Sequence, residues 1–476
     1  MFQNHDKRLL IISNRLPTVI GQTENRWTMK PGTGGLVTAL APVMRENHGV
    51  WLGWPGCDAD APLDSLLREF KEQQGYQLVP VPLSEDEVER YYRGFSNSAI
   101  WPLFHDLLGF CCFDLPQWQA YEAVNQKFAA VVAANTADND FIWVHDYQLM
   151  LVGSHLRELG MQDPLAFFLH IPFPSPDLYR RLPWKTELIR GLLAYDQIGF
   201  QTLRDRRNFV QTASMLVPEL EIVSRKRHHT LLKFGQRLIK VGHYPISIDF
   251  SEFDEGARSH EVEDAAWYLH ENLRGRQLVL GIDRLDYTKG IPERFLAFER
   301  ALEKYPELIK RISLMQVVIP SRTLVPDYAN LKEELDQLAG RINARFGQPE
   351  WVPIHYVFRC LEREQLLARY RTSEIALITP LRDGMNLVAK EYCASSVENN
   401  GVLILSEFAG AADQLGKYAL LVNPYDTDGT ADAIYQAFSM EPEERKQRMM
   451  HLRTEIRRND VHRWLQRFID SSDEEE

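Results

Sequence analysis

The sequence predicts an α/β protein made of two doubly wound halves, each with a mostly parallel sheet. Short runs of Val, Ile, Leu and Phe recur along the chain with helical patterns between them, which is typical of buried parallel strands. Polar and charged residues follow several of these runs directly, as expected where parallel strands end in ligand-binding loops. The chain has 476 residues and 45% of them are hydrophobic, which is enough for more than one core.

The strands and helices follow from the spacing of apolar residues. Two helix faces stand out, one on which apolar residues recur three or four apart after residue 117, and one that begins near Pro292. The first face carries Trp118, Tyr121, Val124, Phe128 and Val131, and the second carries Phe295, Phe298 and Leu302. The expected strands are Leu9–Ile12, Val50–Gly53, Phe141–Val144, Ala166–Leu169, Leu238–Val241, Leu278–Ile282, Ile312–Val318, Ile375–Ile378 and Val402–Leu405.

A domain boundary is expected near the segment Tyr244–Asp249, because an acidic and polar stretch follows it before the next strand. This gives an N-terminal domain over residues 1–248 and a C-terminal domain over 249–458, facing each other across a cleft. Residues 471–476 read as a disordered acidic tail.

Composition excludes several classes of function. The formal net charge of −12 argues against a general nucleic-acid binder, which needs a basic footprint. No stretch approaches the roughly 18 to 20 apolar residues of a membrane span, and no signal-like segment opens the chain, so we expect a cytoplasmic protein without a membrane partner. The five cysteines lack paired CxxC spacing, and no third ligand accompanies any His or carboxylate at metal-binding spacing.

The glycines at 32, 34 and 35 open a predicted helix but match neither a dinucleotide fingerprint nor a phosphate-binding P-loop. They are read either as a tight turn or as a place where backbone approaches a phosphate closely.

The most informative stretch is residues 382–388 (RDGMNLV), followed by Glu391. It comes after the strand Ile375–Ile378 and the breaker Thr379–Pro380, so it is predicted to be a polar loop leading into a helix over 386–393. A helix that begins at the carboxyl end of a parallel strand turns unpaired N–H groups toward a ligand. Anionic or hydroxyl-rich ligands suit such a loop.

Arg284 and Lys289 come from one loop after the strand Leu278–Ile282, and both cations suit a diphosphate. Surface ion pairs explain such cations about equally well when they are taken alone.

Three further clusters leave two interpretations open. His145–Asp146 follows the strand Phe141–Val144, and His170 follows Ala166–Leu169; both are read either as structural groups or as site residues. Residues 91–102 (YYRGFSN to WP) are expected to form an aromatic and polar loop, which either stacks on a sugar or forms a buried aromatic cluster.

With these motifs in order, the chain resembles the trehalose-6-phosphate synthase family, retaining glycosyltransferases of the GT-B type (family 20). The resemblance runs from Leu9 to about Arg467. It is carried by SNRLP, GGLVTAL, YYRGFSN, WVHDYQL, FFLHIPFPSP, GFQT, DRLDYTKGIPERF, PSR, AGRIN, TPLRDGMNLVAKEY and EFAGAA.

The resemblance implies two groups of site residues. Those for the phosphate and sugar of glucose 6-phosphate, the acceptor, are Arg15, Tyr92, Trp101, Asp146 and Arg322. Those for the nucleotide sugar, the donor, are Gly35, His170, Arg284, Lys289, Asp383, Gly384, Met385, Asn386, Leu387, Val388 and Glu391. Of these, Asp146, His170, Arg284, Lys289 and Asp383 are the expected catalytic residues.

The implied reaction moves glucose from a nucleotide glucose, most simply UDP-glucose, onto the anomeric hydroxyl of glucose 6-phosphate with retention. The leaving phosphate itself takes the acceptor's proton, so no carboxylate pair, metal or other cofactor is expected. The cleft is expected to close on the donor, and the last helix, roughly 459–470, to cross back to the first domain. The partners are small-molecule substrates, and the oligomeric state is left open, with a homo-oligomer as one outcome.

Rival interpretations keep the fold but change its use. The acceptor could be glycerol 3-phosphate or a cyclitol phosphate, or the chain could be a non-catalytic sugar-phosphate sensor. A pyridoxal-phosphate phosphorylase rests on fold analogy alone.

The chain departs from the family in its long segment Leu16–Thr33, which borders the expected acceptor site, and in Ser247, which replaces a glycine at the expected hinge.

Overall fold

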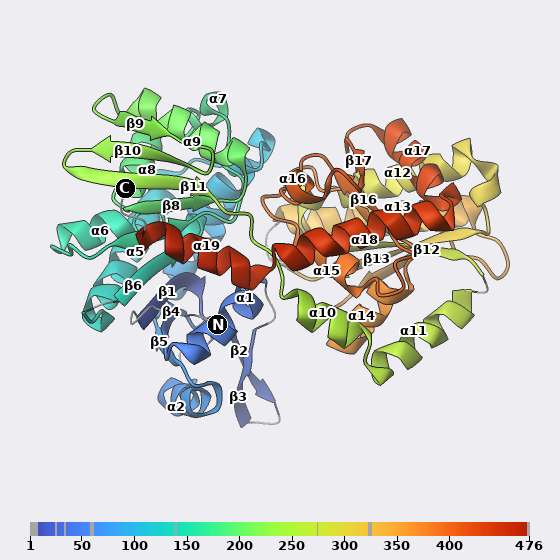
Figure 1. Cartoon of the computed structure of the whole chain (residues 1–476), viewed down its shortest axis with the longest axis horizontal. Coiled ribbons are helices and arrows are strands. Elements are labelled where there is room, and N and C mark those ends of the chain that lie inside the picture. The colour runs from blue at the N-terminus through green and yellow to red at the C-terminus, as the bar shows by residue number, and fades with distance from the viewer. Residues whose placement is uncertain are drawn as a thin grey trace. The chain divides into compact units, whose positions relative to one another are not determined.

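The computed structural model describes residues 8–23, 26–32, 35–57, 61–138, 140–273, 275–321 and 326–473, and they form two compact units (Figure 1). The first contains the chain up to Pro245 and the segment from Trp464; the second contains Ile246–Arg463. The observed transition between Pro245 and Ile246 lies close to the expected boundary at residue 248. Both units have sheets in which parallel pairs dominate, so the predicted α/β class is confirmed.

The sheet of the first unit has the strand order of doubly wound proteins. Neighbouring strands are parallel as far as β11, and only β10 and β9 are antiparallel additions at the edge. Up to β8 the order is 3-2-1-4-5-6, which makes β1 and β6 neighbours at the point where the order reverses. From one edge to the other, the strands are β5 (Gln77–Pro80), β4 (Val50–Trp54), β1 (Arg8–Arg15), β6 (Asp140–His145), β7 (Leu165–Phe168), β8 (Gln197–Phe200), β11 (Arg237–His243), β10 (His229–Phe234) and β9 (Glu221–Arg225).

Helices of this unit bury the apolar faces that the sequence predicts. In α5 (Leu115–Asn135), which is capped by Asp114, the predicted apolar face is buried except for Val131, which is half-buried beside a buried Val132. The other main helices are α1 (Gly35–Glu46), α2 (Leu63–Gln74), α5 (Leu115–Asn135), α6 (Val152–Glu158), α8 (Lys185–Leu192) and α9 (Leu203–Leu216).

The last helix, α19 (Val461–Asp473), packs on the sheet of the first unit (Figure 1). The ring of Phe468 stacks on Trp143 of β6 at 4.3 Å between centroids, and the Trp464 indole N–H donates to the Tyr244 carbonyl at 3.1 Å. Because α19 continues to Asp473, residues 471–473 of the expected disordered tail are helical; the amide of Gln197 donates to the Ser471 hydroxyl at 2.7 Å. Residues 474–476 lie outside the described residues.

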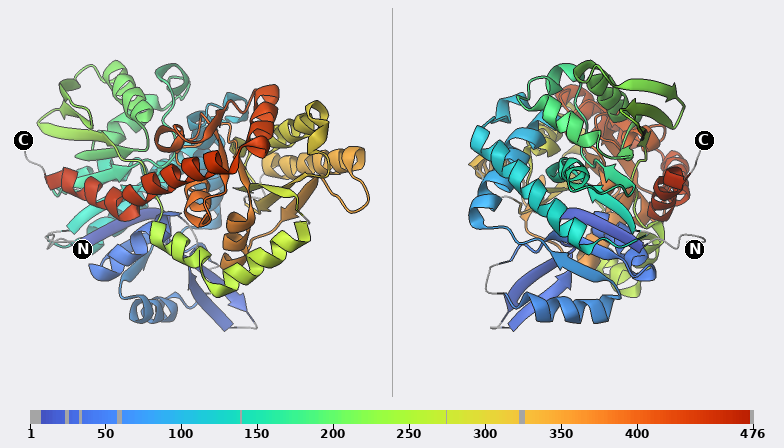
Figure 2. Two further views of the ribbon diagram at one scale, coloured as in Figure 1. Left: turned by 45° about the vertical axis from the view of Figure 1, so that its right-hand side comes forward. Right: turned by 90° about the vertical axis from the view of Figure 1, so that its left-hand side faces the viewer.

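Two segments near the carboxyl ends of β1 and β4 differ from simple loops. The segment after Arg15 forms a hairpin of β2 (Thr18–Thr23) and β3 (Arg26–Pro31), seen in blue in Figure 2. The prediction of an aromatic loop over 91–102 is wrong, because η1 (Val88–Ile100), a π-helix with a kink at Gly94, runs into α4 (Trp101–Phe104). Its aromatic residues turn inward, with Tyr91 and Phe95 fully buried, and this favours a helix over an exposed loop.

The second unit repeats the same strand order in a fully parallel sheet. Its strands are β14 (Ile354–Phe358), β13 (Ile312–Ile319), β12 (Gln277–Arg284), β15 (Ile375–Ile378), β16 (Val402–Ser406) and β17 (Leu420–Val422), so β12 and β15 are neighbours where the order reverses. Its main helices are α10 (Phe250–Ala257), α11 (His260–Leu273), α12 (Ile291–Lys304), α13 (Pro326–Phe346), α14 (Arg363–Thr372), α15 (Leu387–Ser395), α17 (Thr427–Ser439) and α18 (Pro442–Arg458). In α12, Pro292 lies in the first turn and Phe295, Phe298 and Leu302 are buried, as predicted.

We predict that Phe468→Ala destabilises the protein by about 3–5 kcal/mol, because it removes a fully buried ring from its stack on Trp143. Chemical denaturation followed by tryptophan fluorescence measures the loss. Phe113→Ala, at a ring that is 37% exposed, is the matched control and should cost far less. A loss below 1 kcal/mol for Phe468→Ala would mean that α19 does not hold the first unit together.

Candidate active site

Strand order brings the polar strand ends of the first unit to one edge of its sheet. Asn14 and Arg15 lie at the end of β1, and His145 and Asp146 at the end of its neighbour β6. The Tyr91 hydroxyl of η1 donates to the Asn14 side-chain oxygen at 2.8 Å, which fixes the aromatic helix to this edge.

Arg15 lies among aromatic rings and has no carboxylate ion-pair partner in the part of the chain that the structure describes. Its guanidinium lies 5.1 Å from the centroid of the Trp54 ring and donates to the Gly56 carbonyl at 3.2 Å. The Trp54 ring in turn lies 6.0 Å from the ring of Tyr92. An exposed cation that is positioned by aromatic rings and not neutralised by a carboxylate suits an anionic ligand.

Trp54 was missed by sequence reasoning, although the signal was present. It ends β4 beside β1, where Leu16 N–H donates to its carbonyl at 2.9 Å. Trp54 directly follows the predicted strand Val50–Gly53, as His145–Asp146 follows Phe141–Val144, so the same pattern indicated it.

Trp101 joins η1 and α4 to the loop after β6. It is 5% exposed, and its ring lies 5.6 Å from the ring of Tyr147, whose hydroxyl donates to Asn97 at 2.8 Å. The residues predicted for the acceptor thus include an exposed part, Arg15, and a buried part, Trp101.

Asp146 has a strained backbone, with φ of 75° and ψ of 169°. A non-glycine residue in this region costs about 1–3 kcal/mol, and such strain gathers at functional sites. Its carboxylate accepts from the His170 backbone N–H at 3.2 Å, and its own N–H donates to the Phe168 carbonyl at 2.8 Å. The strain therefore fixes Asp146 against the strand end that carries His170.

His145 and His170 form a buried, neutral pair. Nδ1 of His145 and Nε2 of His170 share a hydrogen bond of 3.0 Å, and the Gln201 amide donates to His170 Nδ1 at 3.3 Å. With Nδ1 as an acceptor, His170 carries its proton on Nε2 and donates it to His145. Burial lowers the pKa of His170 to about 3, and burial together with the neighbouring His170 lowers the pKa of His145 well below its usual value. Both rings are uncharged at pH 7.

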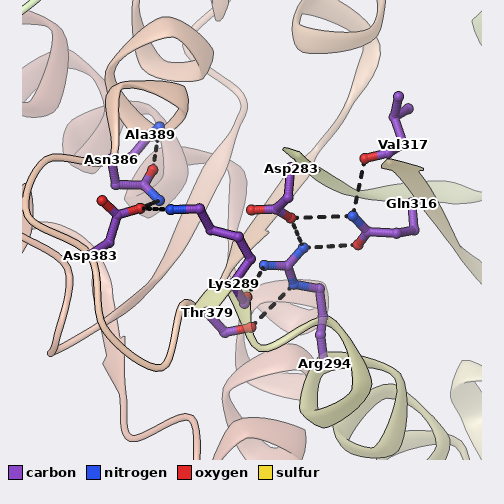
Figure 3. Close-up of polar contacts among 9 residues, drawn as sticks. All are labelled: Asp283, Lys289, Arg294, Gln316, Val317, Thr379, Asp383, Asn386 and Ala389. Atoms are coloured by element: carbon purple, nitrogen blue, oxygen red, sulfur yellow. Dashed lines mark hydrogen bonds and ion pairs between the residues drawn. The ribbon is translucent and has the colours of Figure 1, made fainter. Parts of the chain in front are cut away.

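In the second unit, an ion pair joins the two loops that follow the neighbouring strands β12 and β15. The Lys289 Nζ lies 2.6 Å from the Asp383 carboxylate, and each side chain is 11% exposed (Figure 3). Asp383 also accepts from the Met385 N–H at 3.2 Å and from the Asn386 amide at 3.3 Å. The residues predicted from two separate motifs therefore meet.

The backbone of the Asp383 loop is held from both sides. Leu381 N–H donates to the Thr288 carbonyl at 2.8 Å, and Gly410 N–H donates to the Asp383 carbonyl at 2.9 Å. A β-carbon on Gly410 would lie 1.8 Å from the Gly384 carbonyl oxygen, so only glycine permits this contact. The loop is thus positioned before any ligand arrives.

A buried arginine that sequence reasoning missed supports the same loops (Figure 3). Arg294 of α12 is 1% exposed; it pairs with Asp283 of β12 and donates to the Gln316 side-chain oxygen at 2.8 Å and to the Thr379 hydroxyl at 3.2 Å. It also donates to the Lys289 carbonyl at 3.3 Å. One satisfied cation therefore ties together β12, β13 and the two loops.

Helix α15 begins directly behind the loop. Asn386 has a left-handed backbone, with φ of 62°, and its side chain accepts from the Ala389 N–H at 3.2 Å. The first-turn N–H groups of Leu387 and Val388 have no partner four residues earlier in the helix, so they are available to an anion or a sugar hydroxyl.

Glu391 and Lys390, one turn further into α15, are held in different ways. The Tyr370 hydroxyl donates to Glu391 at 2.8 Å, and burial raises the pKa of this carboxyl. Lys390 is buried, donates to the Ile246 carbonyl at 2.7 Å and to Gln414 at 2.6 Å, and has its pKa lowered by burial to about 7.

The remaining predicted donor and acceptor residues are placed as follows. Arg284, at the end of β12, is exposed and takes part in no ion pair among the described residues. Gly35 begins α1. Arg322 lies outside the described residues.

The described residues show neither a metal-binding cluster nor a membrane-spanning helix. No group of three or more His, Cys, Asp and Glu side chains there is arranged to hold a metal ion. None of the helices in that part of the chain is long and apolar enough to cross a membrane.

Comparison with known proteins identifies the family. The sequence model of the protein family described as "Glycosyltransferase family 20" matches residues 7–474 of this chain. A trehalose-6-phosphate synthase from Mycolicibacterium vanbaalenii is 41% identical over 467 residues, which cover 97% of this chain and 95% of the relative.

Solved structures agree with this similarity. One, named trehalose-6-phosphate from E. coli bound with UDP-2-fluoro glucose, has a TM-score of 0.87 and 36% identity and covers 98% of both chains. Another, an alpha,alpha-trehalose-phosphate synthase (UDP-forming) from Burkholderia xenovorans in complex with glucose-6-phosphate, has a TM-score of 0.86 and 34% identity and covers 98% of this chain and 100% of its own. The family that its motifs indicated is thereby confirmed, and the chain belongs to glycosyltransferase family 20.

Proposed function

We propose that this protein transfers glucose from UDP-glucose to glucose 6-phosphate with retention of configuration, giving α,α-trehalose 6-phosphate and UDP. The observation that carries the proposal is the ion pair of Lys289 with Asp383, in which Lys289 comes from the loop that follows the exposed Arg284 at the end of β12. Cations and a hydroxyl-binding carboxylate are thereby gathered where a nucleotide sugar needs them. Relatives named for UDP-2-fluoro glucose and for glucose-6-phosphate support the choice of substrates.

The first unit is proposed to bind the acceptor. Arg15 supplies a fork-shaped cation for the 6-phosphate, with Trp54 and Tyr92 beside it. Asp146 and Trp101 are assigned to the sugar hydroxyls and ring, and Arg322 is assigned to the same phosphate from its motif.

The second unit is proposed to bind the donor. Arg284 and Lys289 neutralise the diphosphate, while Asp383 and the amides of residues 384–388 bind glucose and phosphate. Glu391 accepts from the ribose hydroxyls, for which its position one turn into α15 and its contact with Tyr370 provide support. Gly35 and His170 are assigned to the donor from their family motifs.

In the proposed mechanism the departing diphosphate takes the proton of the attacking hydroxyl, and no side chain forms a covalent bond to glucose. The buried pair His145 and His170 supports this, because a neutral imidazole with a pKa of about 3 is a poor base at neutral pH. Catalysis then rests on positioning and on stabilisation of the leaving group by Arg284, Lys289 and the amides of α15. We propose that no metal or other cofactor is needed.

The function is tested by incubating the purified protein with UDP-, GDP- and ADP-glucose and with phosphorylated acceptors, and identifying the disaccharide by NMR. Formation of trehalose 6-phosphate from UDP-glucose and glucose 6-phosphate is expected. A product made only with glycerol 3-phosphate or a cyclitol phosphate would replace the proposed acceptor, and no product with any pair would favour a sensor.

Arg284→Ala should slow glucose transfer by about a hundredfold or more, because it removes one charged donor to the developing diphosphate. Steady-state kinetics and the dissociation constant for glucose 6-phosphate measure the effect, and acceptor binding should stay nearly unchanged. Arg300→Ala, at a half-buried arginine of α12 paired with Asp428, is the control. Equal activity of Arg284→Ala and the unmodified protein would contradict the assigned role.

His170 should not appear in the pH profile of transfer. Burial lowers its pKa to about 3, so the ring stays neutral as pH falls from 8 to 5, whereas an unperturbed histidine gains its proton near pH 6.5. We therefore expect His170→Asn to lower kcat without removing an inflection between pH 5 and 8. An inflection near pH 6.5 that disappears in this variant would instead make His170 a titrating acid or base.

A further inference from the structure

A group of basic residues that the proposed reaction does not use lies in the first unit, near the carboxyl ends of β8 and β11. It consists of Arg206 in α9, Arg227 and His228 in the turn between β9 and β10, His243 at the end of β11, and Arg467 in α19. We call these residues the α9–β11 cation cluster. They come from four elements, in a chain whose formal net charge is −12.

Arg206 is the unusual member, because it is a buried cation without a carboxylate. It is 6% exposed, and its Nη1 donates to the Arg227 carbonyl at 3.2 Å. The adjacent carboxylate of Asp205 accepts instead from the Thr202 hydroxyl at 2.6 Å and from the Phe173 N–H at 3.0 Å. Buried charges are normally paired, since desolvation of a lone charge is costly, so Arg206 lacks the counterion expected at such a site.

The rest of the cluster supplies no counterion to Arg206. None of the ion pairs among the described residues includes Arg206, Arg227 or Arg467. The rings of His228 and His243 are nearly parallel, with centroids 6.2 Å apart, and His243 Nδ1 is buried without a hydrogen-bond partner in the described part of the chain. Burial, Arg206, His228 and Arg467 lower the pKa of His243 to about 4, and burial and Arg227 lower that of His228.

We propose that the α9–β11 cation cluster is a second anion site, which binds a phosphate dianion through Arg206, Arg227, Arg467 and the two imidazoles. Guanidinium groups match phosphate oxygens with paired donors, and a dianion satisfies several cations at once. It also supplies the acceptor that the His243 nitrogen and the buried Arg206 lack.

The chain's own acidic end is a weaker candidate for the occupant. Helix α19 runs from Trp464, bound to the carbonyl of Tyr244 after β11, to Ser471, bound to Gln197 at the start of β8. Because β8 and β11 are parallel, the end of α19 points toward the amino ends of the strands, away from His243. A free phosphate or a phosphomonoester therefore fits the cluster better than residues 474–476.

The test uses the full chain carrying Arg15→Ala, which removes the cation proposed for the phosphate at the active site. Inorganic phosphate is titrated while the ring signals of His228 and His243 are followed by NMR. A bound anion favours the protonated imidazole, so phosphate should raise the pKa of His243 by about 1 or more. Adding Arg467→Gln or Arg227→Gln, both at exposed positions, should weaken phosphate binding at least tenfold. Arg463→Gln, an exposed arginine of the same helix outside the cluster, should leave it unchanged.

Glucose 6-phosphate and UMP, titrated in the same way, distinguish a site for free phosphate from one for a phosphomonoester. Unmoved histidine signals with every probe, or equal binding by the Arg467→Gln and Arg463→Gln proteins, would overturn the proposal. So would binding that occurs only after residues 474–476 are deleted, since the acidic end would then be the natural occupant. Because Arg15→Ala is present throughout and activity is not the readout, failure here is distinguishable from failure of the proposed reaction.

Discussion

The strand order of the two sheets constrains every contact of the candidate site. In each unit the order reverses between two neighbouring parallel strands, β1 and β6 in the first and β12 and β15 in the second. Loops that leave such strands must diverge to opposite faces of the sheet, and the space between them is where ligands bind in doubly wound proteins. The ion pair of Lys289 with Asp383 spans the two loops of the second unit, so residues 94 positions apart are held 2.6 Å from each other by topology.

The sequence predicted this arrangement where the signal was local. Strand ends, the helix predicted over 386–393 and the apolar face of α12 follow from short-range patterns, and the structure has them. The contacts it could not predict depend on distant residues. Arg294 reads as an ordinary helix residue until β13 brings Gln316 beside it. The η1 segment is not predicted as a helix from its sequence, because the period of a π-helix differs from the 3.6-residue spacing of an α-helix.

Arginine burial and pairing separate three uses of the same side chain. Arg294 is buried and fully paired, with Asp283, Gln316 and Thr379 around it, so it stabilises the loops and cannot also bind a ligand. Arg15 and Arg284 are exposed and have no carboxylate among the described residues, so each can exchange water for phosphate without breaking an ion pair. Arg206 is buried and unpaired, a combination that neither a purely structural role nor an ordinary surface role explains.

Helix α19 contributes residues near the candidate active site and to the α9–β11 cation cluster. Its Trp464 ring lies 6.5 Å from His170 and packs on Phe168, while Arg467, less than one turn later, belongs to the cation cluster. A shared helix alone does not make a phosphate in the cluster an effector of transfer, because a ligand shifts an equilibrium only through different affinities for two states. Coupling would require α19 to have two positions on the sheet. The stacked ring of Phe468 on Trp143 opposes such movement and favours a site that stabilises the fold over one that switches it.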